Sequence, residues 1–211
     1  MQEYLQPTDY LDFEAPIIQK LVAPFRELPT PREQAVALYL RVRDGWRYNP
    51  YRISLRPDDF RASVVAARPD GHCVDKSVLY IAGLRALGIP ARLHLGTVIN
   101  HIAVERLTER FGTNELSPHG MVQVHLDGAW RKASPAFNKE LCERCQVDPM
   151  DFDGKTDSVF QQYNRAGNRF MEYTEDFGTF ADVPVEFMFQ TMARKYPEVA
   201  SQFKRGEVAE F

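Results

Sequence analysis

Residues 121–134 contain the pattern that most restricts how this chain can fold. Apolar and polar residues alternate through 121–126 and again through 129–134, and Asp127-Gly128 separates the two runs. Asp-Gly between alternating runs favours a two-residue turn with positive φ angles. The sequence therefore predicts a β-hairpin, and with it an antiparallel sheet.

A two-residue turn also fixes which residues of the hairpin face each other. Leu126 pairs with Ala129, and counting outward sets Met121 opposite Ser134 and His119 opposite Ala136. His119 then lies diagonal to Ser134 on one face of the sheet, within reach of a side-chain contact. His125 is expected to pair across the hairpin with Trp130.

Two helices have clear start and stop signals. Thr30-Pro31-Arg32-Glu33 provides a hydroxyl cap, Pro at the first helical position and Glu three residues after the cap, which predicts a helix from Pro31 to about Arg43. After Gly71, apolar residues recur at helical spacing until Gly88. Cys73 is therefore expected at the start of this second helix or within its first turn.

Three further elements follow from the same kind of pattern. A helix start is expected at Asp58 or Asp59, and the alternating residues Ile89–Ile99 predict a strand packed behind the second helix. Between Val183 and Phe203, aromatic residues and methionines recur near helical spacing. The simplest interpretation is one helix that closes the core; the alternative is that this stripe lines a substrate groove.

Composition excludes several classes of protein. A chain of 211 residues with 44% apolar residues fits a single domain spanning 1–211, and a net charge of −3 makes nucleic acid an unexpected partner. The first twenty residues lack the pattern of a secretion signal, and apolar runs stay far below the roughly 20 residues that cross a bilayer. Three cysteines fit a reducing compartment. We expect a soluble, cytoplasmic protein without a membrane partner.

Cys73 and His119 are the residues best suited to chemistry. A thiol at a helix start faces unpaired backbone N–H groups, which should stabilise the thiolate, lower its pKa and hold an oxyanion. A nucleophilic cysteine also needs a base, and His119, between Pro118 and Gly120 at the rim of the hairpin, is the best placed of five histidines.

The motifs around both residues resemble a known family. The segment 71–77, GHCVDKS, followed by LRALGIPAR at 84–92, and then HGMVQVHLDGAW at 119–130 are similar to the core of transglutaminase-like proteins. The similarity covers 71–135, with a further likeness at Trp46-Arg47-Tyr48. It implies an α+β, papain-like fold in which the Cys73 helix packs on an antiparallel sheet, with helical extensions at both ends, and a Cys-His-Asp arrangement.

Ser134 departs from the family pattern, which has an acid before Pro at this position. A serine hydroxyl can still orient the imidazole, but it brings no negative charge to stabilise the imidazolium. Asn138, Asp148 or Asp151 can in principle approach instead.

Two interpretations of function follow from the resemblance. In the first, the chain is a cysteine acyltransferase, amidohydrolase or protease with catalytic residues Cys73, His119 and Ser134. It would act on a peptide, protein or small amide and need no cofactor or metal. In the second, it is a catalytically weakened or inactive binding or scaffold module that retains the fold.

Two other motifs have simpler explanations. Cys142 and Cys145 have the spacing of a zinc or redox half-site, but no second ligand pair follows. The acidic stretch 148–157 lacks the ligand pattern of a calcium loop and is expected to be a solvated loop.

Overall fold

Helix α4 (Cys73–Ala86) forms the centre of the molecule. Its residues are apolar nearly all round, and every residue from Cys73 to Arg85 is buried, as expected of a helix surrounded by other elements. The computed structural model describes residues 1–101, 104–159, 161–202 and 208–210. The helix prediction is confirmed, including the stop before Gly88, which has a φ of 74°.

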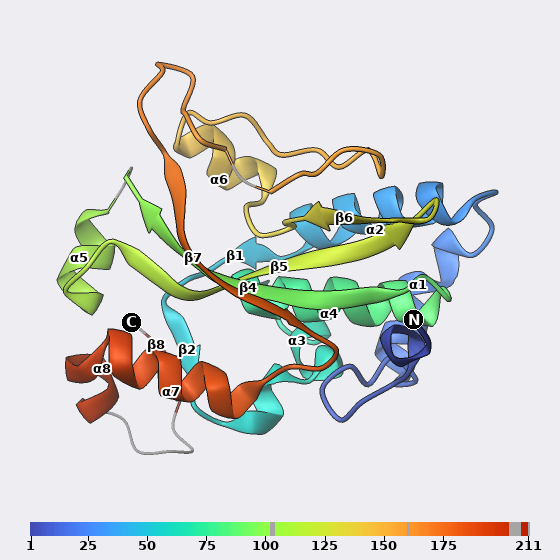
Figure 1. Ribbon diagram of the computed structural model, residues 1–211, viewed down its shortest axis with the longest axis horizontal. Coiled ribbons are helices and arrows are strands. Elements are labelled where there is room, and N and C mark those ends of the chain that lie inside the picture. The colour runs from blue at the N-terminus through green and yellow to red at the C-terminus, as the bar shows by residue number, and fades with distance from the viewer. Residues whose placement is uncertain (102–103, 160, 203–207, 211) are drawn as a thin grey trace.

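One face of α4 packs on an antiparallel sheet, and Figure 1 shows the helix running alongside β4 and β5. The strand order is β6-β5-β4-β7. The strands are β4 (Ala91–Asn100), β5 (Glu115–Leu126), β6 (Ala129–Ala133) and β7 (Met171–Phe180). An α+β fold with the Cys73 helix on an antiparallel sheet is therefore confirmed.

The hairpin has the predicted turn and register. Leu126 pairs with Ala129 and His125 with Trp130, and Asp127 and Gly128 have φ angles of 50° and 82°. The ladder ends at the pair Val122–Ala133. Met121 and Ser134, and His119 and Ala136, consequently lie beyond the last paired residues.

The opposite side of α4 is covered by helices from the first third of the chain. These are α1 (Pro16–Val22), α2 (Pro31–Gly45) and α3 (Ala62–Ala66). Helix α2 begins with the predicted capping box of Thr30 and Glu33 and extends two residues past Arg43. Helix α3 begins at Ala62 rather than at Asp58 or Asp59, because those residues belong to a 3-10 turn.

Short elements complete the described chain. They are the 3-10 helices η1 (Gln2–Leu5), η2 (Ala23–Phe25) and η3 (Pro57–Phe60), helices α5 (Glu105–Phe111) and α6 (Lys139–Arg144), the parallel pair β1 (Arg47–Tyr48) and β3 (Asp70–Gly71), and the antiparallel pair β2 (Arg52–Ser54) and β8 (Val208–Glu210).

The end of the chain differs from the prediction of one helix. It forms α7 (Val185–Lys195) and α8 (Pro197–Gln202), separated at Tyr196, while Phe203 lies outside the described residues. The break has a steric cause, because a residue that precedes proline is disfavoured in the α conformation. Tyr196 has φ and ψ of −130° and 64°. No helix in the described part of the chain is long and apolar enough to cross a membrane.

Candidate active site

The thiol of Cys73 is at the first position of α4, with only 6% of the residue exposed. Burial raises its pKa to about 11, although the nearby backbone N–H groups of Gly120, Val74 and Cys73 itself favour the thiolate. The expectation of a lowered pKa is therefore wrong. Desolvation outweighs the helix start, and the N–H groups of Val74 and Asp75 also donate to the imidazole Nδ1 of His72, at 3.1 and 3.3 Å.

A close contact between α4 and β5 holds the thiol beside His119. A side chain at Gly120 would place its Cβ 2.9 Å from the Cα of Val74, so only glycine allows this approach. The N–H group of Gly120, which follows His119 directly, is near the Cys73 sulfur and lowers the pKa of the thiol. The structure thus places the thiol against the peptide group that joins His119 to Gly120.

The imidazole of His119 is buried and uncharged at neutral pH. Burial lowers its pKa to about 4, with a further contribution from His72. Among the described residues, no hydrogen bond partner reaches its buried Nδ1 atom. The thiol and the imidazole are therefore both neutral, and no hydrogen bond joins them in the described part of the chain.

Ser134 lies beside His119 without a hydrogen bond to it. The two residues line one cavity of about 10 Å³, together with Gln161, which is at the lower limit for a single water molecule. The backbone of Ser134 is held firmly, since its N–H donates to the carbonyl of Ser158 and its carbonyl accepts from the Tyr39 hydroxyl, both at 2.9 Å.

The other residues considered as substitutes for the acid are engaged elsewhere. The side-chain oxygen of Asn138 accepts from the Tyr48 N–H at 2.9 Å, Asp148 pairs with Arg165 at 2.8 Å, and Asp151 pairs with Arg43 at 2.6 Å. Within the described residues, no carboxylate therefore orients His119.

Lys76 fixes the first turn of α4. Its fully buried ammonium group donates to the carbonyls of Arg43, Trp46 and Ala136 at 2.7, 2.8 and 2.7 Å. Burial lowers its pKa to about 7. These three bonds tie the start of the Cys73 helix to the end of α2 and to the segment that follows Ser134.

Three tyrosines surround the thiol, and sequence analysis noted only Tyr48 as a neighbour of the site. Burial raises the pKa of Tyr48, Tyr173 and Tyr196, and the Cys73 thiolate charge would raise it further. Tyr173 comes from β7, and its ring centroid is 5.9 Å from that of His119. No signal in the sequence indicated Tyr173, because the charged stretch 171–180 lacks the apolar pattern of a strand.

The sequence matches the family model of the transglutaminase-like superfamily over residues 19–135, which is more than half of the chain. The chain belongs to the transglutaminase-like superfamily. The match contains Cys73, His119 and Ser134 in the order that the motifs suggested, so the resemblance found at 71–135 is confirmed and extends further towards the N-terminus.

The other comparisons add little to this family assignment. Among solved structures, one match is a candidate cysteine protease from Cytophaga hutchinsonii, with 20% sequence identity and a TM-score of 0.49. The match covers 63% of this chain and 40% of that protein, so the chain spans less than half of its length. The search of curated proteins found no match.

The remaining cysteines do not form a second centre of this transglutaminase-like chain. Cys142 and Cys145 are both free thiols, and burial raises the pKa of each. Cys142 is fully buried beside the carbonyl of Phe137, at 3.9 Å. Among the described residues, no group of three or more His, Cys, Asp or Glu side chains is arranged to hold a metal ion.

Proposed function

We propose that the protein transfers acyl groups through Cys73, from an amide or related carbonyl to water or to an amine. The observation that supports this most directly is the close approach of Gly120, the residue after His119, to Val74 in the first turn of the Cys73 helix. Cys73 and His119 lie inside the region that matches the family. A peptide, a protein side chain or a small amide would supply the acyl group.

The neutral state of the pair determines how the first step runs. With a thiol pKa of about 11 and an imidazole pKa of about 4, the resting pair is thiol and imidazole. The proton moves from sulfur to His119 as the S–C bond forms, and Nδ1 is the acceptor because it is buried without another partner. The backbone N–H groups near the sulfur can then stabilise the oxyanion.

The remaining steps return every group to its starting state. The imidazolium of His119 gives its proton to the leaving nitrogen, the C–N bond breaks, and a thioester remains on Cys73. Water or an amine then attacks the thioester carbonyl, the S–C bond breaks, and the proton of the attacking molecule returns to the thiol. His119 acts as base and acid in turn, and the chemistry requires no metal or organic cofactor.

A specific observation favours a second candidate, a binding module that has lost catalysis. Ser134 gives His119 no carboxylate, and no ion pair joins His119 to an acidic side chain among the described residues. An imidazolium formed during the reaction would therefore be stabilised only weakly. On this alternative the cavity beside Cys73 binds a ligand without forming a thioester.

An activated ester distinguishes the two candidates. We expect p-nitrophenyl acetate to give a burst of p-nitrophenolate and an acetyl adduct on Cys73, identified by intact-mass and peptide analysis. Cys73→Ala should abolish the burst, whereas the matched control Cys145→Ala should leave it unchanged. Acetylation confined to Cys145, or a burst that survives Cys73→Ala, would favour the binding module.

The leaving group provides a test of His119. p-Nitrophenolate departs without a proton, but an anilide nitrogen must be protonated as it leaves. We therefore expect His119→Ala to slow turnover of p-nitroacetanilide more than acylation by p-nitrophenyl acetate. Equal losses on both substrates would contradict the role of His119 as the acid.

A further inference from the structure

Two adjacent apolar cavities extend from Cys73 along α7. Cys73 lines the inner cavity, of about 70 Å³, and the outer cavity has a volume of about 290 Å³. Ile53, Met192 and Tyr196 line both, so the two cavities are adjacent, and movement of the flexible Met192 side chain would join them. We call them together the acyl channel.

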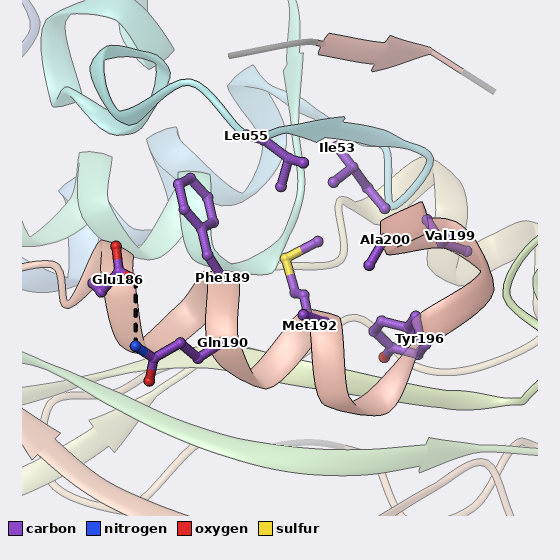
Figure 2. Close-up of a pocket in the computed structure, with 10 residues that line it drawn as sticks. Ile53, Leu55, Glu186, Phe189, Gln190, Met192, Tyr196, Val199 and Ala200 are labelled. Carbon is purple, nitrogen blue, oxygen red and sulfur yellow. Dashed lines mark hydrogen bonds between the residues drawn. The ribbon is translucent and has the colours of Figure 1, made fainter. Parts of the chain in front are cut away.

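The wall of the acyl channel comes from β2 and its following loop on one side and from α7 and α8 on the other. Figure 2 shows Phe189 and Met192 of α7 pointing towards Leu55 and Ile53, with Val199 and Ala200 near Tyr196 at the α8 end. Residues Met188 and Met192 also reach the inner cavity. Methionine side chains are flexible and adapt to apolar ligands of varied shape.

Several polar groups along the acyl channel are engaged with the protein itself. The Tyr196 hydroxyl accepts from the Ser117 N–H at 2.6 Å and donates to the carbonyl of Glu115 at 3.1 Å. The Ser54 hydroxyl donates to Asp59 at 2.5 Å. Glu186 and Gln190 line the outer cavity and hydrogen bond to each other at 3.3 Å (Figure 2).

This chemistry fits a hydrocarbon better than a peptide. A peptide chain brings an N–H and a carbonyl with every residue, and burying them without partners is costly. A hydrocarbon chain has no such requirement and gains free energy from leaving water. The outer cavity, at about 290 Å³, is also close to the lower end of the range of about 300–1,000 Å³ for small-molecule sites.

The position of His119 indicates which part of a substrate enters the acyl channel. His119 lines the small cavity that it shares with Ser134, whereas Cys73 lines the channel. The leaving nitrogen must face His119 to receive its proton, so the acyl part must extend the other way. The acyl chain attached to the carbonyl carbon then lies in the channel.

From these observations we propose that the substrate carries an unbranched apolar acyl chain, which lies in the acyl channel while Cys73 holds its carbonyl carbon as a thioester. This inference rests on the proposed acyl transfer and narrows it to fatty acyl donors. The aromatic and methionine stripe of α7 then lines a substrate groove, the alternative that sequence analysis left open.

A series of p-nitrophenyl esters tests the inference on the unmodified chain. Acetate, butyrate, hexanoate and octanoate are compared by the second-order rate of Cys73 acylation, each divided by the rate with free N-acetylcysteine. Full burial of a methylene group corresponds to roughly a fourfold gain in rate. Even with partial burial we expect hexanoate to acylate Cys73 roughly tenfold faster than acetate.

A variant that narrows the outer cavity tests whether the longer acyl chains bind there. Ala193 lines this cavity and is exposed to solvent, so Ala193→Phe is compatible with the fold. We expect it to remove the advantage of hexanoate and octanoate over acetate. Ala166→Phe, at another exposed position remote from the lining residues, is the matched control and should retain the full series.

Each outcome separates this inference from the proposed function. Acylation of Cys73 at the same rate by all four esters would overturn the apolar substrate and leave the nucleophile intact. A rise with chain length that persists in Ala193→Phe would place the chain outside the acyl channel and also overturn the inference. Failure of every ester to acylate Cys73 would reject the proposed function itself.

Discussion

His94 and His119 lie on the same face of the sheet but in opposite chemical situations. His94 pairs with Met121, which is two residues from His119 on β5. His94 is fully partnered: the Gln123 amide donates to its Nδ1 at 3.1 Å, and its Nε2 contacts the carboxylate of Asp176 at 2.7 Å. His119 has neither an amide nor a carboxylate at its buried Nδ1 within the described residues.

The comparison separates a histidine with two hydrogen-bond partners from one whose buried Nδ1 has none among the described residues. A histidine with a carboxylate partner resembles part of a catalytic triad, yet both ring nitrogens of His94 are already engaged, so neither is left to accept the thiol proton. The hydrogen bonds of His94 join β4 to β7 and continue to Arg92, whose guanidinium donates to Gln123. A buried polar atom without a partner is rarer and calls for an explanation. In the proposed mechanism, this atom accepts the proton of the Cys73 thiol.

Replacement of each histidine in turn gives the largest expected effect. We expect His119→Ala to slow p-nitroacetanilide turnover by roughly 10²- to 10⁴-fold, the usual contribution of a general acid-base group. His94→Ala should leave the rate within about threefold, because His94 contacts no reacting group in the proposed mechanism. Equal losses in the two variants would remove the distinction drawn above.

Because His119 is buried and neutral, lowering the pH should reduce the free energy of unfolding. Its pKa is about 4 in the folded chain and about 6.5 when unfolded. Between these values only the unfolded state binds the proton, so the free energy of unfolding falls as pH falls from 6.5 to 4. The full contribution is about 3 kcal/mol.

Urea unfolding at several pH values measures this contribution. We expect wild type to lose about 3 kcal/mol more than His119→Phe between pH 6.5 and 4. The difference between the two should vanish above pH 7, apart from a constant offset due to packing. Parallel pH curves over the whole range would show that His119 is not held neutral by burial.

The parts of the fold that sequence could predict depend on local signals. The hairpin register follows from Asp127-Gly128, and the start of α2 follows from the capping box at Thr30. Both patterns act within a few residues and need no knowledge of the rest of the molecule.

Strand β7 and the state of the thiol could not be predicted in the same way. Strand β7 carries Glu172, Glu175 and Asp176 and is largely exposed or half-buried, so its apolar alternation is weak. It is held by pairing with β4, which is distant in sequence. The pKa of Cys73 likewise depends on burial by other segments, and that burial reverses the effect of the helix start that local sequence suggests.

The partners of His94 should matter for stability rather than for catalysis. We expect His94→Ala to lower the free energy of unfolding by about 1–3 kcal/mol, because the Gln123 amide loses its acceptor in a buried position. Asp176→Asn should cost less than about 1 kcal/mol, since the Asp176 side chain is 67% exposed. Chemical denaturation of both variants at pH 7 provides the measurement. A larger loss for Asp176→Asn would contradict this assignment.

Ser134→Asp sharpens the comparison by giving His119 the kind of partner that His94 already has. A carboxylate at this position would stabilise the imidazolium that forms when the thiol proton is transferred. We expect p-nitroacetanilide turnover to rise roughly tenfold, which corresponds to about 1.4 kcal/mol in the activation free energy. The new charge should also raise the pKa of His119, so the acid limb of the pH-rate profile should move to higher pH.

Ser134→Asn is the matched control, because it has the same shape as Asp and can orient the imidazole without a charge. A gain with Asp alone would show that the site lacks electrostatic stabilisation of the imidazolium. Equal gains with Asp and Asn would show that it lacks orientation of the ring. No gain with either would mean that the small cavity shared by His119, Ser134 and Gln161 already supplies what the imidazole needs, most simply through one bound water molecule. The absence of a carboxylate beside His119 would then not distinguish an inactive module from an enzyme.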